Sequence, residues 1–268
     1  MIAVMVLMIV GGIGLAQAVS DPKQVTLQWL RLGGLIAVTL LAVQGTLYWV
    51  AGPQPGPWFW VGWTIVTGAF TYQLVTVQLA QRVCQRVAAL LGCLACVPVT
   101  GAAILHGVTG MADGSARSHA PVFADTPIIE LGMVSFLGAG LVGGCLMTML
   151  LGHAYLAAGG DMSQKPFARL VIIMAALIGC RIVISILFGL RPYLQSEDVQ
   201  PRTWLMLLIT TRYLVGLGVP GLFTYMIADC VKRRANQSAT GILYVTLVLI
   251  ILGEGTALTL FERTGQGF

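Results

Sequence analysis

The chain has 268 residues, and its 15 lysines and arginines outnumber its 10 acidic residues, which gives a formal net charge of +5. Only 9% of the residues are charged and 57% are apolar, whereas a soluble domain carries about 25% charged residues. This composition excludes a globular protein with a water-covered surface. It favours one whose solvent is mostly lipid, where ionised side chains are costly.

Eight apolar windows follow one another along the chain, each about long enough to cross a hydrocarbon core of about 30 Å as a helix. In chain order they cover residues 1–19, 32–51, 58–80, 87–108, 131–157, 168–190, 203–228 and 241–261. Breakers such as the Gly- and Pro-rich segment 52–57 separate them. The sequence therefore predicts an all-α, polytopic bundle of about eight spans that forms one integral membrane domain over residues 1–268. No motif repeats between its two halves.

The first window ends in a sequence, around Ala16 and Ala18, that resembles a signal-peptidase site. However, no lysine or arginine precedes this apolar run, so the basic region of a signal peptide is missing. Lys23 and Arg31 follow the run instead. This arrangement favours a retained first helix whose N-terminus lies outside.

The lysines and arginines are unevenly distributed between the two sides of the predicted bundle. Nine lie in alternate connections and four in the others, while Arg181 and Arg212 fall inside windows. Because basic residues accumulate on the cytoplasmic side, this distribution predicts both termini outside, in a bacterial inner membrane. It also explains the positive charge without nucleic-acid binding. The expected partners are the lipid bilayer and other membrane or periplasmic subunits.

Ionisable residues inside the windows are the strongest candidates for a functional site. Arg181, Arg212 and Glu254 lie at a similar predicted depth, and Gln44 reaches the same level. An unpaired arginine at the centre of a membrane helix costs at least about 2.5 kcal/mol, so these groups are expected to face the interior and pair. They predict a buried polar pocket for a quinone carbonyl, haem propionates or an anionic solute. The structural alternative is an Arg–Glu clamp that joins helices.

Two histidines lie in windows, His153 near the inner end of the fifth and His106 at the outer end of the fourth. Imidazole ligates haem iron in membrane cytochromes. Two bis-histidine haems would need four such ligands and are therefore excluded. A single haem b or a quinone contact remains a candidate role for either residue, and the alternative is an interfacial histidine without a ligand.

Cys93 and Cys96 form a C-x-x-C motif, which in a redox protein would suggest thiol exchange. They are candidate redox thiols, but they lie among Leu, Ala and Val, where burial disfavours the reactive thiolate. Packing is the alternative role for these two cysteines. The six cysteines of the chain do not form the disulfide framework of a secreted domain.

Two groups of small residues predict special packing. A small residue recurs every four positions from 140 to 152, which favours close approach of another helix. In the seventh window, glycines surround Pro220 close to Arg212. This second group predicts either a hinge or broken helix, or a static kink.

Three functions fit these features. The preferred hypothesis is a membrane subunit of an electron-transfer complex, linked to quinone or haem b through the buried charges and a histidine. The second is a small-solute transporter that uses the buried charges and the soft segment around Pro220. The third is a structural or assembly protein without a site of its own. No catalytic residue and no metal site is predicted.

Overall fold

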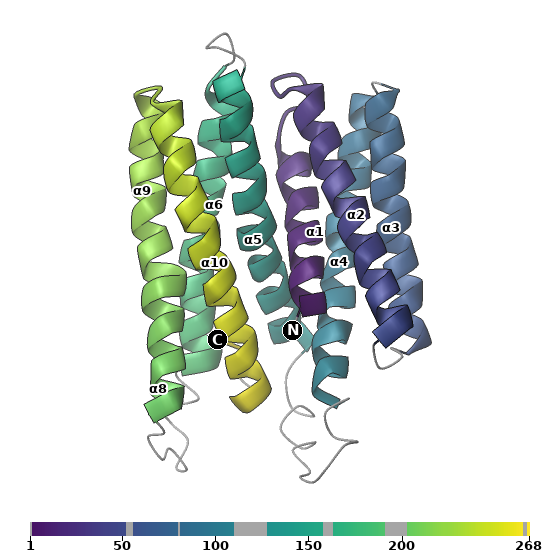
Figure 1. The fold of residues 1–268 in the computed structure, drawn as a ribbon, viewed down its shortest axis with the longest axis vertical. Coiled ribbons are helices and arrows are strands. Elements are labelled where there is room, and N and C mark those ends of the chain that lie inside the picture. Colours follow the sequence, from purple (N-terminus) through teal and green to yellow (C-terminus); the bar gives the residue numbers. More distant parts are fainter. Residues whose placement is uncertain are drawn as a thin grey trace.

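The computed structural model describes residues 2–51, 56–79, 81–109, 128–157, 163–190, 203–264 and 267–268. Within these ranges the regular structure is entirely helical. The elements are α1 (Ile2–Val19), α2 (Leu27–Ala51), α3 (Pro57–Gln78), α4 (Arg82–Thr109), α5 (Ile128–Ala157), α6 (Lys165–Ile184), the π-helix η3 (Ser185–Leu190), α8 (Thr203–Thr210), the π-helix η4 (Thr211–Gly218), α9 (Val219–Lys232) and α10 (Asn236–Thr264). Because α6 runs on into η3, and α8 into η4 and α9, the described elements form eight helical rods (Figure 1).

Six of these rods are long and apolar enough to cross a membrane. They are Leu27–Val50, Val83–Ile104, Glu130–Ala157, Lys165–Leu190, Thr203–Lys232 and Asn236–Thr264. Ala3–Val19 is apolar but shorter, and α3 is not among the six, since its threonines and glutamines dilute its hydropathy. Length and composition therefore support an all-helical, multi-pass membrane protein.

The outer surface of the bundle is apolar. Large side chains such as Ile172, Leu214 and Leu222 are more than half exposed. In water such a surface would drive aggregation, whereas in a bilayer it faces acyl chains. Trp49 and Trp58, 76% and 84% exposed, lie where α2 ends and α3 begins. Tryptophans in such positions are typical of a membrane interface.

The eight rods pack as two rings of four. In the first ring, α1 contacts α2 and α4, and α3 joins those two. In the second ring, α5 contacts α6 and α10, and α9 joins those two. The rings meet mainly where α1 packs against α5, and both of these central helices point the same way, so the halves are stacked side by side without inversion (Figure 1). The absence of a repeated motif explains why the sequence did not predict this arrangement.

The contact between the rings depends on two glycines. A Cβ atom built on Gly12 would lie 2.0 Å from the main-chain oxygen of Ala139, and one on Gly143 would lie 2.2 Å from that of Ile9. Only glycine therefore allows α1 and α5 to approach so closely. The predicted small-residue stripe is displaced by one position here, because a Cβ on Gly144 would meet nothing within 4 Å.

Candidate functional site: a buried ion triad

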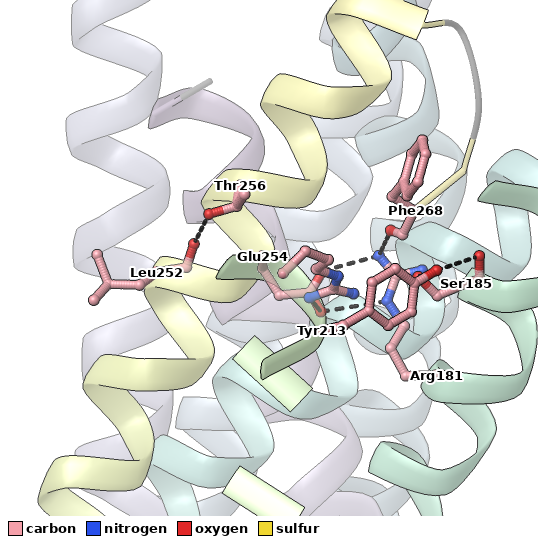
Figure 2. Close-up of polar contacts among 8 residues, drawn as sticks. Arg181, Ser185, Tyr213, Leu252, Glu254, Thr256 and Phe268 are labelled. Atoms are coloured by element: carbon pink, nitrogen blue, oxygen red, sulfur yellow. Dashed lines mark hydrogen bonds and ion pairs between the residues drawn. The ribbon is translucent and has the colours of Figure 1, made fainter. Parts of the chain in front are cut away.

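Arg181, Arg212 and Glu254 meet inside the second ring. Arg181, in the last turn of α6, places its Nη2 atom 3.0 Å from Glu254 Oε2 and its Nε atom 3.3 Å from Oε1. Arg212, in η4, places its Nη1 atom 3.1 Å from Glu254 Oε1. The exposed fractions of the three side chains are only 0%, 0% and 1%. The structure thus brings together the three charges predicted to lie deep in the apolar windows. Figure 2 shows Arg181 and Glu254 of this group.

The triad holds two cations against one anion. Both guanidinium groups contact Glu254. Arg212 Nη1 forms an ion pair with Glu254 Oε1, but no nitrogen of Arg212 has a partner in hydrogen-bond geometry among the described residues. Arg181 Nη1 is also without one. A guanidinium group carries five N–H donors and is always charged. Buried donors without a hydrogen-bond partner are costly, so the Arg212 guanidinium group suits an anion or another strong hydrogen-bond acceptor.

A widened helical turn carries Arg212. In η4 the amide of Val219 donates to the carbonyl of Leu214, five residues back, as in a π-helix. The local cause is Pro220, which has no N–H to donate to the carbonyl of Gly216. Gly216 in turn packs directly on α10, since a Cβ atom there would lie 2.5 Å from the Cα atom of Gly253. The predicted soft segment is therefore a continuous, widened helix rather than a broken one.

A hydroxyl contact joins the two π-helical segments beside the triad. The hydroxyl group of Tyr213 donates to the main-chain oxygen of Ser185 at 2.8 Å (Figure 2). Ser185 Oγ also lies within hydrogen-bonding distance of the Tyr213 hydroxyl oxygen, at 3.2 Å. Since Ser185 follows Arg181 by one turn and Tyr213 follows Arg212 directly, both irregular segments converge on the same polar site.

Gly267 and Phe268 cover the triad. The main-chain oxygen of Phe268 accepts a hydrogen bond from Arg181 Nη2 at 2.9 Å, and its side chain is 1% exposed (Figure 2). The amide of Gly267 donates to Glu130 Oε1 at 3.0 Å. Gly189 provides the space, because a Cβ atom there would lie 2.9 Å from Phe268. The triad is therefore enclosed by a short segment held at two points.

Gln44 does not lie with the triad. Its side chain is buried on α2, in the first ring, and its Nε2 atom donates to the main-chain oxygen of Ala3 at 2.9 Å. Helices α1 and α5 stand between α2 and α10 (Figure 1). Depth fixes only one of three coordinates, so the grouping of Gln44 with the charges in one pocket is wrong.

His153 is not part of the triad. His153 is exposed near the end of α5, whereas Arg181 lies in the last turn of α6, which runs in the opposite direction to α5 (Figure 1). His106 lies in the last turns of α4, and its side chain falls outside the part that the structure describes. Among the described residues, no group of three or more His, Cys, Asp or Glu residues could hold a metal ion.

Cys93 and Cys96 are free thiols, 2% and 1% exposed. Both face α1, where a Cβ atom on Gly14 would lie 3.2 Å from Cys93 Cβ and one on Gly11 3.2 Å from Cys96 Cβ. They therefore fill space where α4 packs on the glycine-rich side of α1. A redox role for this pair stays a prediction.

A second polar cluster was missed at the sequence level. Gln73 Nε2 donates to Gln17 Oε1, and Gln17 Nε2 donates to the main-chain oxygen of Leu30 at 2.9 Å. Nearby, Arg86 Nη2 donates to the main-chain oxygen of Ser20 at 2.9 Å. The available signal was the presence of uncharged amides inside apolar windows, which attract less notice than charges although they also require partners.

Comparisons with known proteins provide no relative: no family model matches the chain, and neither does any curated protein or solved structure. A function can therefore be inferred only from the geometry of the triad and its surroundings.

Proposed function

We propose that the chain is an eight-span membrane transporter for a small oxyanion, such as a carboxylate or inorganic phosphate, which binds at Arg212. The observation that carries this proposal is the buried guanidinium group whose nitrogens have no hydrogen-bond partner among the described residues. Carboxylates and phosphates match the planar fork of a guanidinium group with two parallel hydrogen bonds.

The proposed topology has all eight rods in the membrane with both termini outside. Helix α1 can cross the membrane although its apolar stretch is short, because little of its surface faces lipid. Most of its side chains are buried between α2, α4 and α5. The basic residues support this orientation, since nine of them lie at the end where α1, α3, α5 and α9 finish. A cytoplasmic membrane, such as that of a bacterium, is the expected location.

The triad divides into a fixed part and a binding part. Arg181 and Glu254 neutralise each other and tie α6 to α10, while Arg212 offers its donors to the solute. The pair of π-helical segments and the Gly216–Gly253 contact lie next to this site and give a place where η4 can shift against α10. Gly267 and Phe268 act as the cover that must move for solute to enter from that end.

An electron-transfer subunit that binds quinone is the second candidate. The contact of Tyr213 with Ser185 beside two arginines favours it, because hydroxyl and guanidinium donors suit a quinone carbonyl. His153 is too far along the bundle to join such a site. A b-type haem would therefore have to be held elsewhere in the protein.

The test is uptake into liposomes that contain the purified protein. Labelled acetate and labelled phosphate serve as separate probes, and the proteins are the native chain, Arg212→Gln and Arg233→Gln. Arg233 is the matched control, since it pairs with Asp229 in an exposed i,i+4 contact. Saturable uptake of at least one probe is expected for the native chain and the control. Arg212→Gln is expected to lose at least about tenfold, as removal of a charge-assisted hydrogen bond costs about 1.5–3 kcal/mol.

Other outcomes assign the triad differently. Equal uptake by the native chain and Arg212→Gln would contradict the anion site. A reduced-minus-oxidised absorption band in the purified protein, or quinone retained by the native chain but not by Arg212→Gln, would favour electron transfer. Folded protein without flux, pigment or quinone would leave the triad as a clamp between helices.

A further inference from the structure

A cavity of about 290 Å³ lies between α6 and α9, at the end of the bundle where α9 finishes. Its wall is apolar and its rim is polar and basic. The lining residues are Gln164, Lys165, Ala168, Val171, Ile172, Ala228, Val231, Lys232 and Arg234. Small side chains at Ala168 and Ala228 leave the space open, and the exposed Ile172 marks its outer edge. The cavity therefore combines a surface for hydrocarbon with a surface for negative charge.

The three cations of the rim are unpaired. Lys165, Lys232 and Arg234 are exposed, and no ion pair engages any of them among the described residues. Arg233 differs, because its Nε atom lies 2.9 Å from Asp229 Oδ2 and it does not line the cavity. The excess positive charge of this turn is thus concentrated on the side of the cavity.

The backbone holds Arg234 at the rim. Arg234 has a φ angle of 57°, a left-handed conformation that is uncommon for a residue with a side chain. Its amide donates to Val231 at 3.1 Å, and the amide of Ala235 donates to Cys230 at 2.9 Å, which closes the end of α9. The fixed turn therefore presents a long cationic side chain at one position of the rim.

The opposite side of the rim offers a hydrogen-bond acceptor and a helix terminus. Gln164 Oε1 is buried and has no partner among the described residues. The first helical residue is Lys165, whose amide donates to Ser163 Oγ at 3.4 Å, and Gln164 forms no side-chain cap. The positive end of the α6 dipole lies on this side of the rim and adds a long-range attraction for an anion.

We propose that this groove is a binding site for one anionic phospholipid of the phosphatidylglycerol type. The phosphate would lie among Lys165, Lys232 and Arg234, and one acyl chain would follow the wall formed by Ala168, Val171 and Ala228. A glycerol hydroxyl group would donate to Gln164 Oε1, which a headgroup without a donor cannot do. Basic pockets between membrane helices bind anionic headgroups in this manner.

The test is native mass spectrometry of the purified full chain in a non-ionic detergent. Dioleoyl-phosphatidylglycerol and dioleoyl-phosphatidylcholine are titrated separately into the native protein, Lys232→Gln/Arg234→Gln and Arg233→Gln. The native chain and Arg233→Gln are expected to retain one phosphatidylglycerol, with at least fivefold preference over phosphatidylcholine. The double variant is expected to lose this preference. All substituted positions are exposed, so folding should not be affected.

Two results would overturn the proposal. Equal retention of both lipids by the native chain would remove the evidence for a charge-specific site. An equal loss of preference in Arg233→Gln and in Arg234→Gln alone would show a diffuse surface attraction instead of this groove. As a further check, Ala228→Phe is expected to reduce retention of phosphatidylglycerol while glycerol 3-phosphate fails to compete. Full competition by that soluble headgroup would contradict the use of the apolar wall.

Discussion

The two rings have the same layout of four helices but use opposite polar chemistry. In the first ring the deeply buried polar contacts are made by uncharged amides, with Gln17, Gln73 and Gln44 as the main examples. In the second ring they are made by the charged triad, next to two π-helical segments. The amides bond to the backbone and to each other, but Gln44 Oε1 and Gln73 Oε1 also lack a partner among the described residues. The triad differs from them because its groups are charged and the charges are unequal in number.

This difference suggests a division of labour. The described helices of the first ring contain no π-helical segment, and Pro98 lies inside α4. The core of this ring consists of aliphatic and aromatic side chains, including edge-on contacts among Tyr48, Phe59 and Trp60. Such a ring suits a rigid support. The second ring places buried charges and two π-helical segments close together. Both features are energetically costly, and in proteins they are found mainly at sites of binding or movement. Four substitutions test this contrast, in order of their expected effect on stability.

The largest loss of stability is expected for Glu254→Gln. It leaves two buried arginines without a counter-ion, and removal of one partner from a buried ion pair costs about 3–5 kcal/mol. Asp229→Asn is the control, since it breaks an exposed pair worth about 0–1 kcal/mol. Thermal unfolding in detergent measures both variants. Similar unfolding temperatures for the two would show that the triad does not depend on the charge of Glu254.

The next largest loss is expected for Gly143→Val, which affects the contact between the rings. The added side chain would overlap the backbone of α1 near Ile9 and Gly12. Overpacking of this kind costs about 1–3 kcal/mol, and main-chain overlap lies at the upper end of that range. Gly144→Ala is the matched control, because a Cβ atom there meets open space. A stable, monodisperse Gly143→Val protein on size exclusion would mean that α1 and α5 can separate without harm.

A smaller loss is expected for Gln73→Leu in the first ring. It removes the donor to Gln17 Oε1, and one buried acceptor left without a partner costs about 1–3 kcal/mol. Solute uptake by the folded variant is expected to stay within about twofold of the native rate, because the first ring supports the site without forming it. An uptake rate as low as that of Arg212→Gln would remove the proposed division between the rings.

The smallest change in stability is expected for Arg212→Gln. It leaves Arg181 and Glu254 as a balanced pair and removes the donors that have no hydrogen-bond partner. Stability is therefore expected to stay within about 1 kcal/mol of the native value, or to rise. Unfolding at a temperature as low as that of Glu254→Gln would instead identify Arg212 as part of a structural clamp.

The sequence predicted the triad because electrostatics leaves few alternatives. Charges within apolar windows must pair, and Arg181, Arg212 and Glu254 lie at one depth. The same reasoning failed for Gln44, because an amide at that depth can be satisfied by any nearby main-chain oxygen, here that of Ala3. The predicted depth of a residue in the membrane does not indicate which helix packs against its side chain.

The sequence was less informative about helix contacts and the cover of the triad. The small residues at every fourth position did not mark the closest contact of α5, since the main-chain contact falls on Gly143 and a Cβ atom on Gly144 would meet nothing within 4 Å. Relative rotation of two helices depends on all their neighbours, so a stripe alone cannot choose between adjacent glycines. The contact of Gly267 with Glu130 joins residues that are 137 positions apart, and no local sequence pattern predicts it.

The most direct test of the anion site is the unfolding temperature of the detergent-solubilised protein, measured at constant ionic strength as acetate or phosphate replaces chloride. An oxyanion that binds the folded protein at Arg212 should raise this temperature with saturation in the native chain and in Arg233→Gln. It should leave Arg212→Gln unchanged. An identical rise in all three proteins, or none in the native chain with either anion, would contradict the proposed site.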